Sequence, residues 1–179
     1  TITQIIADFF SRTLLPMADV VVDIHSGGKT MEFLPFGAAH ILDDKSQQAR
    51  CVSAVEAFNA PYTLMLLEPD AVHLYDTAAE NQGKVFVSTE LGGGGSASAT
   101  SVRIARRGIS NVLKHAGILA GDVERGASVN LDTMNPECFI TSEHRGLIEM
   151  RHDLGAKINA GDILAVIHDT DRTGTAPVE

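Results

Sequence analysis

The sequence lacks tryptophan and contains only two cysteines, Cys51 and Cys138, which lie far apart along the chain. Neither cysteine belongs to a C-x-x-C or C-x-x-H pair, so the sequence predicts neither a disulfide framework nor a cysteine-based zinc site. Proteins without disulfides are typical of reducing compartments, and we therefore expect the protein to be cytoplasmic.

Basic residues are scarce as well, with 14 lysines and arginines against 23 acidic residues and a net charge of −9. Binding to nucleic acid or to an anionic membrane surface requires a basic face, so this balance argues against both partners. No apolar run approaches the roughly 20 residues of a membrane span. The first ten residues contain no basic cluster of the signal-peptide type, and the chain begins with threonine, which indicates a missing upstream segment.

The first 122 residues alternate between helical and extended patterns, which favours a three-layer α/β domain with a largely parallel sheet and helices on both faces. The expected elements are a helix over 3–16 capped by Thr3 and closed by Pro16, strands near 20–28, 33–36 and 38–42, a helix from Asp43 or Asp44 to Phe58, strands over 62–67 and 84–90, and a helix over 96–115. Residues 68–83 are polar and predict a long loop, a kind of segment that is often functional.

From residue 123 onward the helical patterns disappear. Short strands are expected at 137–143, 146–152 and 163–168, separated by turns that contain glycine, which predicts a small all-β domain over 123–179. A domain of this size is near the lower limit of independent stability, so we expect it to pack on the first domain. Its unpaired strand edge favours association into a homo-oligomer.

Two polar residues interrupt the apolar run from Asp19 to Gly28. The run predicts a buried parallel strand, and side chains alternate along a strand, so Asp23 and His25 share one face near its carboxyl end. Ligands bind at that end of open α/β sheets. A neutral imidazole there can bind zinc, with the nearby carboxylate orienting the ring. Alternatively, both side chains form hydrogen bonds to loops and have only a structural role.

Glu90 ends a second apolar strand and is followed by four glycines, Gly92 to Gly95. A carboxylate beside a metal-bound water can accept its proton and later deliver the proton to a leaving amine. The glycines allow close approach of the backbone, and their N–H groups, Gly92 and Gly93 first, can bind an oxyanion. Alternatively, Glu90 pairs with a neighbouring cation and the glycines form a turn. The phosphate-loop patterns G-x-x-x-x-G-K-[ST] and G-x-G-x-x-G are absent.

The other histidines carry no comparable signal. None is followed by glutamate at the third position, so the metal-binding pair H-x-x-E is absent. We assign no role to His40, His73, His115, His144, His152 and His168. The pattern G-x-S-x-G of a nucleophilic serine is absent too.

The motifs Asp23-Ile-His25-Ser-Gly-Gly and Ser88-Thr-Glu90-Leu-Gly-Gly-Gly-Gly resemble those of the succinylglutamate desuccinylase/aspartoacylase family. The resemblance covers most of the chain. It implies a carboxypeptidase-like α/β fold followed by a small β domain of the barrel-sandwich type. It also implies a zinc-dependent hydrolase whose partner is a small molecule, an N-acyl amino acid.

By position, the resemblance makes His25 a ligand of Zn2+ and Glu90 the general base toward the water and then the acid toward the amine. Asp23, Gly92 and Gly93 support the site. The family takes its other two zinc ligands from an upstream G-x-H-G-x-x-E type segment, which this sequence lacks. We therefore expect the C-terminal part of a longer enzyme, unable to hold zinc by itself. The alternative is a non-catalytic remnant or binding module that retains the fold.

The predicted loop over 68–83 contains two candidate substrate-binding residues, Tyr75 and Asp76. Relatives that act on acidic substrates carry tyrosine and arginine in the corresponding region, and arginine is absent from this segment. We therefore hypothesise that Asp76 or Glu80 faces the side-chain ammonium of a diamino acid. The alternative is an ordinary solvated acidic loop.

Overall fold

The computed structural model describes residues 1–67, 74–133, 135–172 and 174–179, and the chain divides into two compact units, Thr1–Asn135 and Pro136–Glu179. The predicted boundary near residue 122 differs from this division. The reason is a short strand, Val129–Leu131, which forms hydrogen bonds with the sheet of the first unit and so keeps residues 123–135 there. No helix in the described residues is long and apolar enough to cross a membrane.

The first unit is built on a five-stranded sheet with strand order β1-β4-β2-β3-β5. The strands are β1 Val20–Val22, β2 Phe36–His40, β3 Tyr62–Leu66, β4 Val85–Glu90 and β5 Val129–Leu131. β1 runs parallel to β4, and β3 runs parallel to both β2 and β5, whereas β2 and β4 are antiparallel. The sheet is therefore mixed, and the expected parallel arrangement is interrupted at its centre.

Side chains that accept hydrogen bonds from free backbone N–H groups cap the first, fourth and last of the helices listed next. They are α1 Ile2–Phe9, the π-helical η1 Phe10–Leu14, α2 Leu15–Met17, α3 Lys45–Phe58, α4 Tyr75–Glu80 and α5 Ala99–His115. Asp44 caps α3 and Ser98 caps α5. The predicted cap Thr3 is wrong, because Thr1 forms a capping box with Gln4. The helical run also continues past Pro16 to Met17, and the π-helical turn Phe10–Leu14 directly precedes this last piece.

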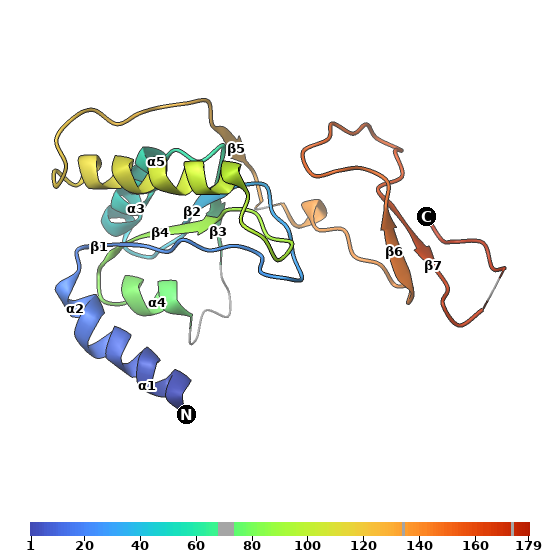
Figure 1. Cartoon of the computed structure of the whole chain (residues 1–179), viewed down its shortest axis with the longest axis horizontal. Helices are drawn as coiled ribbons and strands as arrows, with labels where there is room; N and C mark the ends of the chain where they lie inside the picture. The colour runs from blue at the N-terminus through green and yellow to red at the C-terminus, as the bar shows by residue number, and fades with distance from the viewer. Residues whose placement is uncertain (68–73, 134, 173) are drawn as a thin grey trace. The chain divides into compact units, whose positions relative to one another are not determined.

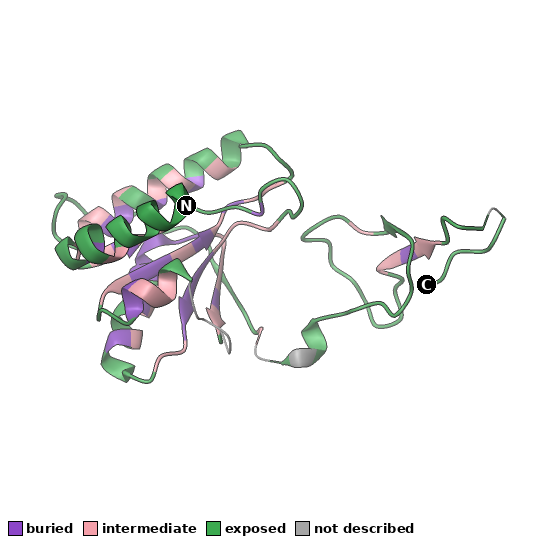
Figure 2. Ribbon diagram, turned by 90° about the horizontal axis from the view of Figure 1, so that it is seen from below, coloured by how far each residue is buried: buried purple, intermediate pink, exposed green. Residues whose placement is uncertain are grey.

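Helices cover both faces of the sheet, as predicted. Neighbouring residues of β4 point in opposite directions: Val87 packs in the cluster formed with α3 and α5, and Phe86 packs in a second cluster with Leu15 of α2 and Ala79 of α4. Figure 1 shows α3 and α5 on one side of the strands and α4 on the other. Figure 2 shows that burial is concentrated on the strands and on the inner faces of α3 and α5.

The predicted loop over 68–83 is wrong for its second half, which contains α4. This helix is too short for periodicity to reveal, and its buried Ala79 packs against Phe86, a tertiary contact that local sequence does not encode. Residues 68–73, including His73, lie outside the described residues.

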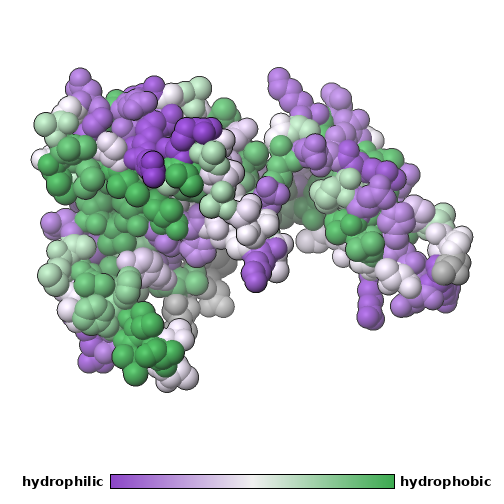
Figure 3. Space-filling model, in the orientation of Figure 1, coloured by the Kyte–Doolittle hydropathy of each residue, from purple (hydrophilic) through white to green (hydrophobic). Residues whose placement is uncertain are grey.

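α1 is the least covered helix of the first unit. It has no buried residue, and Ile2, Ile5, Ile6 and Phe9 are all more than half exposed. Figure 3 shows the hydrophobic surface where α1 lies in Figure 1.

The second unit contains one antiparallel ladder, β6 Leu147–Met150 with β7 Ala165–His168, and Ile167 also bridges to Val178. The strand predicted at 137–143 is wrong. A 3-10 turn, η2 Pro136–Cys138, occupies its beginning, and Ser142 near its end accepts the backbone N–H of His144 at 2.9 Å, which forms a local turn. A barrel-sandwich domain is not formed by these strands and stays a prediction.

Candidate active site

His25 and Glu90 are brought together because β1 and β4 continue side by side beyond the end of β1. The backbone N–H of Asp23 donates to the Val87 carbonyl, and that of Leu91 donates to the His25 carbonyl at 2.9 Å. The two residues therefore lie near each other at the carboxyl end of this parallel pair, as their strand positions predicted.

Thr89 joins the two strands at the site, a role that the sequence reasoning missed. Its side chain is completely buried, its hydroxyl donates to the Asp23 carbonyl at 2.7 Å, and it accepts the His25 N–H at 3.2 Å. In the sequence, only its position next to Glu90 could have indicated this role. These two bonds fix the backbone on both sides of Ile24, and so they fix the origins of the Asp23 and His25 side chains.

Asp23 and His25 form the pair expected from their alternation. The distance between Asp23 Oδ2 and His25 Nδ1 is 3.3 Å, and the His25 side chain is 60% exposed. A carboxylate at Nδ1 favours the tautomer whose Nε2 is free of a proton, which is the form that can bind a metal ion. The pair therefore presents an oriented imidazole toward the solvent-facing side of the sheet edge.

Glu90 is held in a drier environment than His25. Its Oε2 is buried and has no hydrogen-bond partner among the described residues. Burial raises the pKa of the Glu90 carboxyl group above its usual range; the nearby His25 opposes this rise and Asp23 adds to it. A carboxyl group with a raised pKa is suited to accept a proton and then return it.

The loop after His25 and the glycine loop after Glu90 are joined by backbone hydrogen bonds. Gly27 donates to the Gly92 carbonyl, Gly94 donates to Met31, and Gly95 donates to Gly28. The amide donors of Gly94 and Gly95 are thus used inside the protein. The prediction that glycine N–H groups bind an oxyanion therefore concerns only Gly92 and Gly93.

Glycine is required at position 93 because a Cβ there would overlap the Met31 carbonyl oxygen. In the full-length protein, we expect Gly93→Ala to push the two loops apart and to lower kcat/KM by about 10²-fold, the usual effect of a displacement of about 1 Å at a catalytic site. Steady-state kinetics measures the effect. Gly28→Ala is the matched control, since a Cβ there meets nothing and only the positive φ adds strain. Equal losses in both variants would contradict the argument.

Tyr75 lies on the same side of the sheet as Asp23. Its ring packs edge-to-face on Phe86 and on Phe10, with centroid distances of 5.5 and 5.6 Å. Partial burial raises the pKa of the Tyr75 hydroxyl, and the negative charge of Asp23 adds to this rise. The Tyr75 ring therefore lies on Phe86, on the face of the sheet that carries Asp23.

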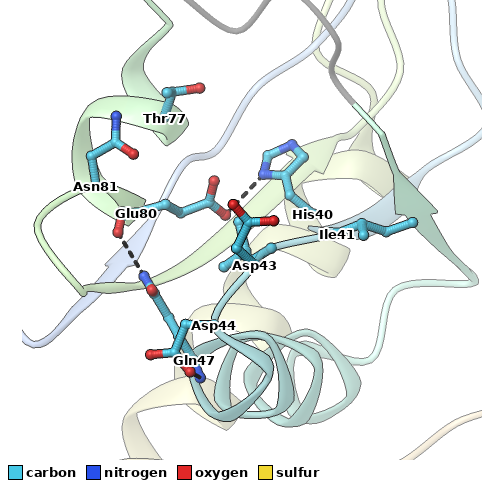
Figure 4. A pocket seen from close by; sticks show the side chains of 9 residues that line it. His40, Ile41, Asp43, Asp44, Gln47, Thr77, Glu80 and Asn81 are labelled. Atoms are coloured by element: carbon cyan, nitrogen blue, oxygen red, sulfur yellow. Dashed lines mark hydrogen bonds and ion pairs between the residues drawn. The ribbon is translucent and has the colours of Figure 1, made fainter.

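Asp76 contacts different groups. Its Oδ1 accepts the backbone N–H of Thr77, and its Oδ2 lies 3.7 Å from His40 Nε2. Glu80 accompanies it, with Oε1 at 2.9 Å from His40 Nδ1. His40 and Glu80 line a cavity of about 290 Å³. Figure 4 shows these two side chains among those that line it. The proposed contact of Asp76 or Glu80 with a substrate ammonium stays a hypothesis.

The side chains at this site could supply part of the coordination of a metal ion. His25 offers an exposed ring nitrogen backed by Asp23, and Glu90 supplies a buried carboxylate oxygen without a protein partner in the described part of the chain. Within residues 1–67, 74–133, 135–172 and 174–179, no three histidine, cysteine, aspartate or glutamate side chains come together to hold an ion. His25 therefore fits as one ligand of a metal whose remaining ligands come from elsewhere.

Comparison with known proteins identifies a family and several relatives. Residues 1–116 match the succinylglutamate desuccinylase/aspartoacylase catalytic domain. The whole chain is 46% identical to the N-alpha-acetyl-L-2,4-diaminobutyric acid deacetylase of Halomonas elongata, of which it covers 53%.

Two solved structures support the same assignment. The product-bound ectoine utilization protein EutE (DoeB) of Ruegeria pomeroyi is 58% identical with a TM-score of 0.93, and a succinylglutamate desuccinylase of Silicibacter sp. TM1040 is 56% identical with a TM-score of 0.92. The alignments cover 99% of this chain and 54% of each of those chains. The chain thus spans about half the length of the relatives it matches.

Proposed function

The chain belongs to the succinylglutamate desuccinylase/aspartoacylase family, and we propose that it forms part of a zinc-dependent hydrolase that cleaves the amide bond of an N-acyl amino acid. The observation that carries the proposal is the juxtaposition of an Asp23-oriented imidazole, His25, with the buried carboxyl group of Glu90 at the end of a parallel strand pair. This arrangement suits hydrolysis because it places a metal ligand next to a proton acceptor.

The residues of this chain divide the chemistry between them. Asp23 orients the His25 ring, and Thr89 fixes the backbone from which both side chains project. Glu90 accepts a proton from the attacking water and returns it to the departing amine nitrogen, which its raised pKa favours. Gly92 and Gly93 are the candidate donors to the oxygen of the acyl carbonyl as it gains negative charge.

His25 would hold a zinc ion together with ligands outside this chain. A bound zinc ion would supply Lewis-acid polarisation of the acyl carbonyl and would acidify a water molecule. The fit rests on the exposed imidazole and on the unpartnered Glu90 oxygen beside it.

For the substrate, we propose an N-acetyl diamino acid of the 2,4-diaminobutyrate type. The supporting observation is the 46% identity over the whole chain to a deacetylase of that specificity. The net charge of −9 also suits a substrate with a cationic side chain better than a dicarboxylate. Comparing kcat/KM for N-acetyl-diaminobutyrate, N-acetylaspartate and N-succinylglutamate tests this choice.

One observation favours a second candidate. His25 is the only expected zinc ligand in the described part of the chain, so the chain by itself would be a binding module that retains the fold without a working metal site. The two candidates differ in whether the chain acquires activity when it is joined to the upstream half that its relatives carry.

Metal content per chain tests both candidates. We expect about one zinc per chain in a protein of the relatives' full length, zinc loss in its His25→Ala variant, and none in the 179-residue chain alone, because a preformed ligand set dominates affinity. Elemental analysis after dialysis provides the measurement, with His115→Ala as a control histidine at the end of α5. Zinc in the short chain that disappears in His25→Ala would show that residues of this chain complete the site.

A further inference from the structure

His40 is a buried histidine that sequence reasoning left without a role. It is 5% exposed and ends β2, at the opposite end of that strand from the residue that pairs with Glu90. Since β2 runs antiparallel to β4 and each residue adds about 3.3 Å, His40 lies roughly 13 Å along the sheet from the Glu90 level. It is therefore too distant to contact the reacting atoms.

Two ionisable partners of His40 in the described part of the chain come from one helix. Glu80 Oε1 lies 2.9 Å from His40 Nδ1, and Asp76 Oδ2 lies 3.7 Å from His40 Nε2, so the imidazole contacts α4 one helical turn apart. Figure 4 shows His40 at the end of its strand with the Glu80 side chain directed toward it. The side chains of His40 and Glu80 are both less than a tenth exposed.

A third residue holds the end of α4. Gln47, buried on α3, donates from Nε2 to the Glu80 carbonyl at 2.8 Å and to the Lys84 carbonyl at 2.9 Å. A helix as short as α4 is unstable without tertiary contacts, so these contacts determine how it lies on the sheet.

Tyr75 is the first residue of α4 and lies one helical turn before Ala79. Ala79 and Val21 pack in the cluster around Phe86, and Asp23 follows Val21 on the same face of the extended chain. The Tyr75 ring also rests on Phe86. Any rotation of α4 on Phe86 would thus move the Tyr75 hydroxyl relative to Asp23.

We propose that His40 is a positioning residue: through Glu80 and Asp76 it fixes α4 so that the Tyr75 ring stays on Phe86, on the face of the sheet that carries Asp23. The inference rests on the proposed function for its effect on substrate, because Tyr75 is a candidate substrate contact. His40 itself touches neither substrate nor metal. We choose its partner Glu80 for substitution. Without the Glu80 carboxylate, His40 still has the carboxylate of Asp76 nearby.

A double-mutant cycle in the full-length protein tests whether the link acts through Tyr75. We expect Glu80→Ala to raise KM about three- to tenfold, the effect of one lost neutral hydrogen bond. In the Tyr75→Phe variant, adding Glu80→Ala should not raise KM further. In the Tyr62→Phe variant, adding Glu80→Ala should raise KM as much as it does in the unaltered protein. Equal effects in both backgrounds would overturn the proposal, since a general loss of stability does not depend on Tyr75.

A second measurement does not depend on catalysis. In the Tyr62→Phe variant of the 179-residue chain Tyr75 is the only tyrosine, and without tryptophan its ionisation is visible by ultraviolet absorbance. Glu80→Ala should lower the Tyr75 pKa toward its usual range, and Glu80→Gln should not. Should Glu80→Ala not fold, Glu80→Asp replaces it, with a smaller shift expected. An unchanged Tyr75 pKa overturns the proposal, whereas absence of hydrolysis in the unaltered full-length protein counts only against the proposed function.

Discussion

Replacement of Glu90 by glutamine in the full-length protein should lower kcat by about 10²–10⁴-fold, the usual contribution of a positioned general base. Glutamine has nearly the shape of glutamate, so the surrounding packing should be retained, but an amide cannot accept a proton from water. The zinc content should stay unchanged, because Glu90 is not an expected ligand. Single-turnover kinetics with N-acetyl-diaminobutyrate measures the loss of the chemical step.

Two results would contradict this role for Glu90. A kcat within about tenfold of the unaltered protein would exclude Glu90 as the general base, since that loss is smaller than a general base contributes. A parallel loss of zinc would assign Glu90 to metal binding. Ser88→Ala, two residues earlier and on the same face of β4, is the matched control and should leave kcat unchanged.

Glu90→Gln, which should lower activity, should raise the stability of the metal-free chain at neutral pH. The pKa of Glu90 is raised in the folded state, so the folded state binds the proton more tightly than the unfolded state does. Stability is therefore lost as pH rises from the ordinary value of 4.5 through the raised value. Glu90→Gln should stabilise the chain at neutral pH, and the gain should vanish well below pH 4.5. Thermal unfolding at several pH values measures the difference.

The sequence contained enough information to place His25 and Glu90 at the same edge of a sheet. Both residues lie at the carboxyl ends of apolar runs that predict strands, which is the edge of an α/β sheet where ligands bind; that these two strands are direct neighbours was not predicted. Alternation along the strand likewise predicted the Asp23–His25 contact, which the structure confirms at 3.3 Å. Asp43 or Asp44 was predicted to start α3, and the structure shows that Asp44 is the cap.

Several of the features that were missed depend on pairing between distant segments. Hydrophobic patterns identify β2 but not its direction, so its antiparallel pairing with β4 could not be predicted. β5 is exposed along its length and joins the sheet through hydrogen bonds to β3, and its three residues are too few for their apolar alternation to predict a strand. His40 and Glu80 are far apart in sequence, and an isolated histidine is more often structural than functional, which is why the cluster on α4 was overlooked.

Gly108 of α5 marks a close approach between helices, and replacing it should strongly destabilise the first unit. A glycine inside a helix normally gains about 1 kcal/mol of stability on replacement by alanine. Here a Cβ would overlap the ring of Phe58, whose Cδ2 would be only 2.6 Å away, and Phe58 is completely buried at the end of α3. Overpacking of a core costs about 1–3 kcal/mol or more, so we expect Gly108→Ala to lower the free energy of unfolding by about 2 kcal/mol.

Urea unfolding of the 179-residue chain, followed by the circular dichroism of its helices, should show a lower midpoint at an unchanged m-value. Arg106→Ala, on the exposed side of the same helix, is the control and should change stability by less than about 0.5 kcal/mol. Combining Gly108→Ala with Phe58→Leu should destabilise less than the two changes added together, because the smaller side chain leaves room for the new methyl group. A stabilising Gly108→Ala would mean that α3 and α5 separate easily, and that their contact does not fix the sheet from which His25 and Glu90 project.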